Sequence, residues 1–429
     1  APHIIWPMRF VLPHSPEQRP AWFIRLGLFL YDHLGGRKRL PATRALDLRR
    51  DPEGAPIRKD FTRAFEYSDC WVDDARLVLL NALDAAEKGA EVLTRTACVG
   101  ARREGEHWLV ELEDRRDQSR RTIRSRCVVN AAGPWVETVL GRVAGINSRR
   151  QVRLVKGSHI ITRKFWEGSQ AYLLQNTDKR VIFVNPYEGD KALIGTTDIP
   201  VEDDPAEVEA DPAEIDYLLA IVNRYFEHGP GPDDVETTFA GVRPLYDDAA
   251  ENPSAVTRDY VFDVEPESPA GGRAPMLSVF GGKITTYRKL AEHALDKLAP
   301  FFPAMRQGWT AKAPLPGGDM PDADFDRFLA SLAQSHPWLP DGLAQHYARL
   351  YGTRAAALLA DAKSPSDLGR HFGGLLYARE VDYLRRHEWA ETAEDILERR
   401  TKHYLHLTPA ERAAFEAWCA EHLAASADA

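Results

Sequence analysis

The sequence has no run of about 18 apolar residues, so it predicts no helix that spans a membrane. No N-terminal signal peptide is visible either. The four cysteines lie far apart and form no CxxC pair: Cys70, Cys98, Cys127 and Cys419. This spacing favours reduced thiols in a cytoplasmic protein and predicts neither a disulfide framework nor a zinc site. Positive charge is not in excess, because the formal net charge is −9, and this argues against a general nucleic-acid-binding protein.

A glycine-rich turn of the GxGxxG type, which cradles the phosphates of a dinucleotide in many α/β proteins, is also missing from the 429 residues. The nearest glycine cluster, Gly229-Pro230-Gly231-Pro232, contains two prolines, which have no backbone N–H to offer a phosphate. The sequence starts at Ala1 and not at a methionine. We therefore expect an N-terminal segment of the parent protein to be missing.

The length and composition describe a folded protein of two or three domains. A chain of 429 residues exceeds one ordinary hydrophobic core, and 44% hydrophobic with 28% charged residues is typical of globular chains. Near the start, residues 21–34 (AWFIRLGLFLYDHL) have the spacing of a helix. This helix could lie in a core, or it could lie on the surface and insert into lipid headgroups. The amphipathic helix expected after Gly282 is a second candidate for membrane contact.

Residues 73–135 predict a compact α/β unit. Asp73 stands where a helix N-cap belongs, and Gly89 stands where the helix should stop. Strand-like runs follow at residues 91–99, 107–113 and 126–131. The last of them is interpreted as an apolar strand of a buried parallel sheet, and it leads into the turn at residues 132–135 (AGPW) and a helical run to Arg142. Such a turn can present N–H groups to a phosphate, although most turns of this kind bind nothing.

The middle of the chain has a mixed-sheet pattern and the end has a helical one. Strand-like runs occupy residues 157–162, 180–186, 192–197, 236–241 and 259–264. A helical run at residues 212–226 interrupts them, which predicts a sheet domain inserted into the first domain. Residues 276–280 form another apolar strand, followed by the Gly281-Gly282 turn and a helix from Lys283. Residues 320–425 predict an all-α domain.

Four positions could carry chemistry. The helix start at Gly281-Gly282-Lys283 offers free N–H groups and a cation, which would stabilise the negative charge of a reduced flavin; the alternative is an ordinary tight turn with a solvated lysine. Arg243 and Arg258 are suited to bidentate binding of phosphate or carboxylate, unless they are surface arginines. His159 lies on an apolar strand, either as a satisfied core histidine or as a general base near neutral pH.

Seven runs, in the same order, resemble the aerobic FAD-dependent glycerol-3-phosphate dehydrogenases. They are residues 65–74 (FEYSDCWVDD), 129–135 (VNAAGPW), 156–160 (KGSHI), 194–198 (IGTTD), 241–245 (GVRPL), 257–260 (TRDY) and 277–290 (LSVFGGKITTYRKL). Each run alone is only weakly specific for this family, but the seven runs together are very specific for it. The resemblance extends from Ala1 into the C-terminal helical region and departs from the family in lacking the GxGxxG turn.

The resemblance implies an α/β and α+β fold of the glutathione-reductase and D-amino-acid-oxidase type, with a mixed-sheet substrate cap and a C-terminal all-α domain. We expect an FAD-binding domain at residues 1–150 and 270–312, a cap at 151–269 and a helical domain at 313–429; residues 10–60 could belong to the cap. The implied reaction is FAD-dependent oxidation of glycerol 3-phosphate to dihydroxyacetone phosphate. Electrons would pass to a quinone, and the protein, either monomer or homodimer, would lie peripherally on the inner face of the cytoplasmic membrane.

The resemblance also implies roles for single residues. His159 would be the general base, Arg243 would orient the reacting oxygen, and Arg258 and Lys283 would hold the phosphate, unless Lys283 faces the flavin. The expected cofactor-binding residues are Cys98, Val99, Ala132, Gly133, Gly281, Gly282, Lys283 and Thr285. No metal is expected.

Two other functions stay open. A glycerol-3-phosphate oxidase would pass its electrons to oxygen, but no insertion of the kind that many such oxidases carry is visible. A non-catalytic flavoprotein or assembly subunit would be expected to have lost some of the four candidate residues, all of which are present. Because the first glycine turn and its strand are missing, we expect the chain expressed alone to hold little FAD and to aggregate.

Overall fold

The computed structural model describes residues 1–34, 40–147, 150–202, 204–247, 259–266 and 273–422. The chain forms two compact units. The helical unit consists of Ala1–Met8, Asp69–Thr94 and Lys312–Ala429. The sheet unit consists of Arg9–Ser68 and Arg95–Ala311. No helix in these described ranges is long and apolar enough to cross a membrane.

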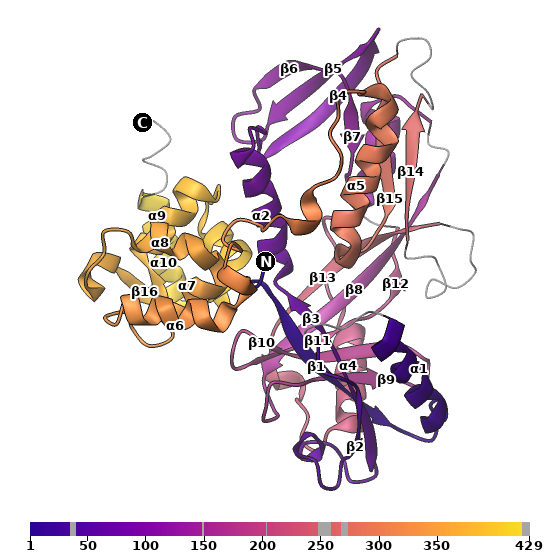
Figure 1. The fold of residues 1–429 in the computed structure, drawn as a ribbon, viewed down its shortest axis with the longest axis vertical. Coiled ribbons are helices and arrows are strands. Elements are labelled where there is room, and N and C mark those ends of the chain that lie inside the picture. Colours follow the sequence, from indigo (N-terminus) through magenta and orange to yellow (C-terminus); the bar gives the residue numbers. More distant parts are fainter. Residues whose placement is uncertain (35–39, 148–149, 203, 248–258, 267–272, 423–429) are drawn as a thin grey trace. The chain divides into compact units, whose positions relative to one another are not determined.

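The largest sheet has the strand order β12-β8-β11-β10-β9-β1-β3-β2, and β13 also pairs with β8 (Figure 1). The strands are β1 (Ile5–His14), β2 (Arg44–Asp47), β3 (Arg63–Val72), β8 (Val152–Arg163), β9 (Ala171–Gln175), β10 (Val181–Tyr187), β11 (Lys191–Gly195), β12 (Ile199–Pro200) and β13 (Val235–Tyr246). β1 is parallel to β9, whereas β8, β10 and β11 pair antiparallel, so the predicted mixed sheet is confirmed. Helix α4 (Pro212–Tyr225) packs Leu218 and Val222 into its core with Ile160 and Ile194. The division into three domains stays a prediction.

Two smaller sheets complete the sheet unit. One has the order β14-β15-β7, from Tyr260–Glu265, Met276–Gly281 and Val128–Asn130. β15 and β7 are parallel, as the run at residues 126–131 predicted, but the predicted full burial of this strand is wrong, because Val129 is 51% exposed. The other has the order β4-β5-β6, from Thr96–Glu104, His107–Asp114 and Arg120–Ser125. The remaining helices of this unit are α1 (Ala21–Leu34), α3 (Val136–Thr138) and α5 (Tyr287–Leu298).

The helical unit has its own apolar core. Its helices are α2 (Asp74–Glu87), α6 (Phe325–Ser335), α7 (Leu343–Tyr351), α8 (Ala355–Leu359), α9 (Ala378–His387) and α10 (Pro409–His422). A short hairpin of β16 (His371–Gly373) and β17 (Leu376–Tyr377) lies among them in the sequence. Tyr347, Leu384 and Phe415 are fully buried at the centre of this core. The predicted C-terminal helical domain is therefore confirmed, and the hairpin is its departure from an all-α pattern.

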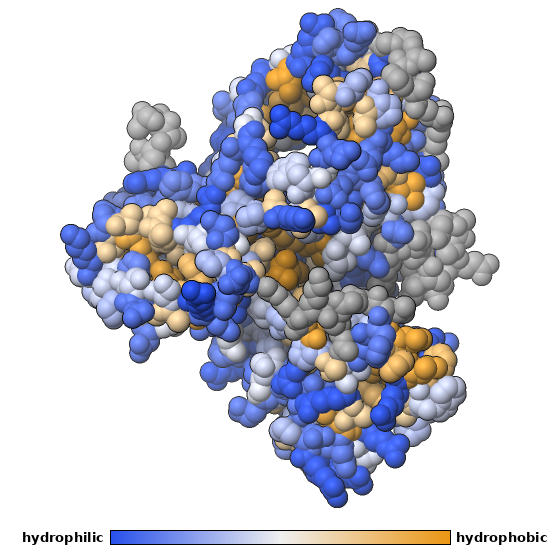
Figure 2. Space-filling model, viewed as in Figure 1, coloured by the Kyte–Doolittle hydropathy of each residue, from blue (hydrophilic) through white to orange (hydrophobic). Residues whose placement is uncertain are grey.

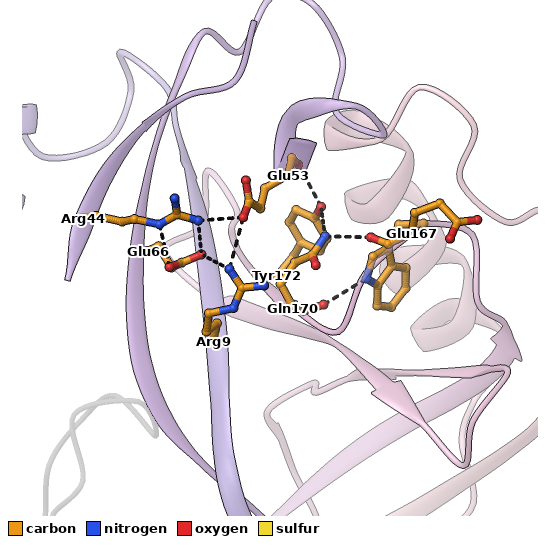
Figure 3. Close-up of polar contacts among 8 residues, drawn as sticks. Arg9, Arg44, Glu53, Glu66, Glu167, Gln170 and Tyr172 are labelled. Atoms are coloured by element: carbon orange, nitrogen blue, oxygen red, sulfur yellow. Dashed lines mark hydrogen bonds and ion pairs between the residues drawn. The ribbon is translucent and has the colours of Figure 1, made fainter. Parts of the chain in front are cut away.

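An ion cluster links the first three strands of the large sheet (Figure 3). Arg9 Nη1 donates to Glu53 Oε1 at 3.2 Å and to Glu66 Oε2 at 3.0 Å, and Arg44 Nε donates to Glu66 Oε1 at 2.8 Å. Tyr172 Oη, on β9, donates to the Glu53 carbonyl at 2.8 Å. Because the two carboxylates are buried, the two arginines are needed to balance their charge. The cluster thereby holds β1, β2 and β3 in one arrangement.

Candidate active site

The pairing of β8 with β13 brings His159 and Arg243 onto adjacent strands. In the register of this pair His159 lies opposite Phe239 and Arg243 lies opposite Val155. On its other side β8 pairs with β11, where His159 lies opposite Gly195. Arg243 follows Phe239 by four residues on β13, and residues an even number of positions apart on a strand point to the same face of the sheet. His159, its cross-strand partner Phe239, and Arg243 therefore share one face. The two side chains are close enough for the charge of Arg243 to affect the titration of His159.

The His159 ring is held between two neighbouring strands. It stacks on the Phe239 ring at 4.8 Å between centroids, with 8° between the planes. On the other side, a Cβ at Gly195 would lie 2.0 Å from His159 Cδ2, so this space is available only above a glycine. His159 Nδ1 is buried and has no hydrogen-bond partner among the described residues. Burial, and then the charge of Arg243, lowers the pKa of His159 to about 4, so the ring is neutral at pH 7 and its pKa lies below the near-neutral value expected from the sequence.

The Arg243 guanidinium is held by residues just beyond β11. Nη1 donates to Asp198 Oδ1 at 2.5 Å, and Nη2 donates to Thr196 Oγ1 at 2.8 Å. The guanidinium lies over Gly157, where a Cβ would be 2.5 Å from Nη2. The sequence interpretation gave no role to Thr196, Asp198 or Phe239. The clustered hydroxyl and carboxylate side chains of residues 194–198 (IGTTD), directly after a strand, were the available signal.

Two glycine turns lie at the carboxyl ends of the parallel strands β7 and β15. Gly133 has φ +56°, and Gly281 and Gly282 have φ +72° and +111°, values that favour glycine. A Cβ at Gly133 would lie 4.0 Å from Pro244 Cγ, and a Cβ at Gly281 would lie 3.3 Å from Tyr246 N. Both turns therefore adjoin the segment of β13 that directly follows Arg243.

The turn after β15 has the donors that a flavin needs. Lys283 has extended backbone and precedes the 3-10 turn Ile284–Thr286, which leads into α5. Lys283 and Thr285 are both exposed, so their polar groups and the N–H groups of the helix start are free to meet an anionic ring edge. Trp135 and Ile284, beside the two turns, are 40% and 42% exposed and offer apolar contact area. Gly133, Gly281, Gly282, Lys283 and Thr285 thus fit an FAD site.

The remaining predicted residues lie in the β7 turn itself, on another sheet or outside the described ranges. Ala132 is partly buried and lies in the β7 turn, where its N–H donates to Asn130 Oδ1 at 3.3 Å. Cys98 and Val99 lie on β4, which belongs to a different sheet from the two glycine turns. Arg258 lies outside the described residues. The structure therefore brings His159 and Arg243 together on β8 and β13. The two glycine turns adjoin the part of β13 that follows Arg243.

Gly157→Ala tests whether the position of Arg243 matters. The new Cβ would come within 2.5 Å of both Arg243 Nη2 and Thr196 Oγ1, and the flexible guanidinium can move away at little cost in stability. We expect kcat/KM of the full-length enzyme for glycerol 3-phosphate, the substrate that the resemblance implies, to fall by one to two decades. The reason is that a charged hydrogen bond contributes about 1.5–3 kcal/mol. Gly241→Ala is the matched control, because Gly241 is the cross-strand partner of Gly157 and its Cβ would meet nothing within 4 Å. Equal kcat/KM for both variants would contradict a role for Arg243.

Comparison with known proteins gives a consistent set of similarities. Residues 1–288 match the family of FAD dependent oxidoreductases, and residues 309–425 match the C-terminal domain of alpha-glycerophosphate oxidase. The sequence is 62% identical to the D-erythritol 1-phosphate dehydrogenase of Brucella abortus, over 97% of this chain and 82% of that protein. It is 52% identical to the glycerol-3-phosphate dehydrogenase of Pseudomonas aeruginosa, over 96% of this chain and 79% of that protein.

A solved structure has the same fold. The glycerol-3-phosphate dehydrogenase from Bacillus halodurans, complexed with FAD, superposes with a TM-score of 0.76 and 27% sequence identity, over 99% of this chain and 79% of that one. Together with the family match, this establishes FAD as the cofactor and confirms the D-amino-acid-oxidase type of fold.

Proposed function

Because this chain belongs to the family of aerobic FAD-dependent glycerol-3-phosphate dehydrogenases, we propose that the enzyme oxidises glycerol 3-phosphate at C2 and releases dihydroxyacetone phosphate. The observation that supports the proposal best is the pairing of a neutral, partly buried histidine with an arginine on adjacent strands, next to a flavin-type glycine turn. Oxidation of a polyol phosphate requires a group that accepts the hydroxyl proton, a cation that binds the reacting oxygen, and a position for the substrate beside the flavin.

We assign each of these requirements, and the binding of the phosphate, to particular residues. His159 takes the proton of the C2 hydroxyl, because it is unprotonated at neutral pH. Arg243 donates to the same oxygen and fixes its direction, while Asp198 and Thr196 hold the guanidinium. Lys283 and Arg258 bind the phosphate. The flavin, when bound, would supply the hydride acceptor, so that the alcohol would become a ketone with loss of one proton to His159 and one hydride from C2.

A longer polyol phosphate is the second candidate substrate. The sequence is more similar to a D-erythritol 1-phosphate dehydrogenase, at 62% identity, than to the glycerol-3-phosphate dehydrogenases of Pseudomonas aeruginosa and Escherichia coli, at 52% and 47%. Both candidates combine a secondary alcohol with a phosphate, so the same residues serve either one. The test is to measure kcat/KM of the full-length enzyme for both compounds, anaerobically, with a quinone analogue as acceptor and then with oxygen. Faster turnover with oxygen would favour the oxidase.

Helix α1 supports a peripheral membrane location and hence a quinone acceptor. Among its apolar side chains, Trp22 is 69% exposed, Phe29 is 56% exposed and Leu26 is 48% exposed, so the interpretation as a core helix is wrong. Figure 2 shows apolar surface gathered over α1. A helix that exposes large apolar groups beside Arg19 and Arg25 has the composition of an interfacial anchor. We propose that α1 inserts into the headgroup region of the cytoplasmic membrane.

The double substitution Trp22→Ser/Phe29→Ser should weaken binding of the full-length enzyme to anionic vesicles by about 10- to 100-fold. Each buried aromatic side chain contributes about 1.5–3 kcal/mol when it is fully removed from water, and these two insert only in part. Flotation with phosphatidylglycerol vesicles measures the effect. Val78→Ser, at an apolar side chain on α2 that is 67% exposed, is the control. Unchanged flotation of the double variant would exclude α1 as the anchor.

A further inference from the structure

A fully buried carboxylate ties together the two backbone segments that carry the proposed active-site groups. Glu214 lies in the first turn of α4, where its Oε2 accepts from the Asp211 backbone N–H at 3.0 Å. It is 3% exposed. Its Oε1 accepts from Ser158 Oγ at 2.8 Å and from Thr197 Oγ1 at 2.6 Å.

A lysine completes the group. Lys156 Nζ lies 2.9 Å from Glu214 Oε2 and 2.7 Å from Asp211 Oδ2, and it is 7% exposed. Ser158 N also donates to Thr197 Oγ1, at 2.9 Å. Although burial opposes ionisation, hydrogen bonds from Thr197, the Asp211 backbone, Lys156 and Ser158 lower the pKa of Glu214 to about 2. Glu214 is therefore an ionised acceptor with all of its donors in place.

The donors to Glu214 are the immediate neighbours of the reacting groups. Ser158 directly precedes His159 on β8, and Thr197 directly precedes Asp198, which holds Arg243. Lys156 and Ser158 flank Gly157, the residue beneath the Arg243 guanidinium. Lys156 is the charged partner of Glu214 and is shared with Asp211, whereas the hydroxyls of Ser158 and Thr197 carry no charge, so charge balance does not account for these two donors. Those two hydrogen bonds set the separation between the segment before His159 and the segment before Asp198.

We infer that Glu214 is a positioning residue for the oxidation: it holds the backbone on both sides of the site so that His159 and Arg243 address the same substrate oxygen. Glu214 touches neither group itself and acts through Ser158 and Thr197. The inference rests on the proposed function, because it uses the roles given there to His159 and Arg243. It adds a residue on α4 that no motif of the sequence indicated.

Glu214→Gln in the full-length FAD-loaded enzyme is the main test. Glutamine keeps the volume but replaces one acceptor oxygen by an N–H₂ group, so one pair of donors loses its partner. We expect flavin reduction per bound FAD to slow by about 10- to 100-fold, and the Kd of the oxidised enzyme for dihydroxyacetone phosphate, followed by flavin absorbance, to rise by a similar factor. The control is Glu236→Gln, a carboxylate of the same sheet that accepts from the buried Lys191 at 2.9 Å. It should change neither quantity.

Thr197→Val is the second variant, in case Glu214→Gln folds poorly. It removes the hydroxyl that links Glu214 to Ser158 and leaves the buried charge pair with Lys156 intact. Slow reduction and weak product binding at full FAD content in either variant would support the inference. Normal rates and normal Kd in both would overturn it, provided that His159→Asn and Gly157→Ala are slow. If those two variants are also normal, the proposed function itself fails.

Discussion

Replacing His159 by asparagine should slow flavin reduction by the substrate about 10²- to 10⁴-fold at neutral pH, the usual contribution of a positioned general base. Asparagine is polar and smaller than histidine, so it fits above Gly195 without a clash. The FAD content should not change, because His159 lies on β8 and the glycine turns that fit the flavin follow β7 and β15. Stopped-flow mixing of the full-length variant with glycerol 3-phosphate measures the rate.

The pH dependence of kcat/KM is the second part of this prediction. Burial lowers the pKa of His159 to about 4, so the free enzyme loses its proton acceptor only when the pH falls through about 4. The acid limb of kcat/KM should therefore lie near pH 4 and not near the ordinary histidine value of about 6.5, and it should be missing in His159→Asn. His228→Asn, at an exposed histidine, should reproduce the native profile. Native reduction rates in His159→Asn would mean that another group takes the proton.

Glu388→Ala should lower the free energy of unfolding of the full-length enzyme by about 3–5 kcal/mol, the usual cost of leaving a buried charge without its partner. Arg76 and Glu388 are each 1% exposed, and two hydrogen bonds join them, at 2.5 Å and 2.9 Å. Arg76 Nη2 also donates to the Leu350 carbonyl at 2.7 Å. The pair connects α2 to the C-terminal helices within the helical unit. Without Glu388 the guanidinium would stay buried with one carbonyl and the face of Tyr351.

Urea denaturation followed by circular dichroism measures this loss. Glu394→Ala is the control, because Glu394 pairs with Arg399 at the surface, where both side chains are at least half exposed, and such pairs contribute about 0–1 kcal/mol. The double variant Arg76→Met/Glu388→Leu should recover much of the stability, since it removes both buried charges together. A loss under about 1 kcal/mol in Glu388→Ala would show that water reaches the guanidinium.

Local signals in the sequence predicted local structure well. Helix α1 has the predicted bounds Ala21–Leu34, and the Asp73 side chain caps α2 by accepting from Arg76 N. The predicted strand at residues 91–99 begins only at Thr96, because Arg95 adopts φ +53°. The run after Gly133 is not one α-helix either, since α3 ends at Thr138 and a π-helical turn, Val139–Val143, follows. Backbone departures of this kind depend on packing against other segments, which periodicity does not contain.

In the candidate site too, local sequence signals identified some residues, and contacts made by the fold determined the others. His159 and Arg243 could be named because each lies in a short motif. Their neighbours could not, because Phe239 reaches His159 only through the register of β8 with β13, and Asp198 reaches Arg243 only through the path of the chain after β11. The pair Arg76–Glu388 is separated by 312 residues, and no local pattern connects two such positions.

The measurement that tests the central claim most directly is anaerobic mixing of the full-length FAD-loaded enzyme with glycerol 3-phosphate, D-erythritol 1-phosphate or glycerol, followed by flavin absorbance. The claim is that this family member oxidises a short polyol phosphate at a site built around His159 and Arg243. It predicts rapid bleaching by at least one of the phosphates and none by glycerol at the same concentration. Equal bleaching by glycerol, or none by either phosphate, would contradict it.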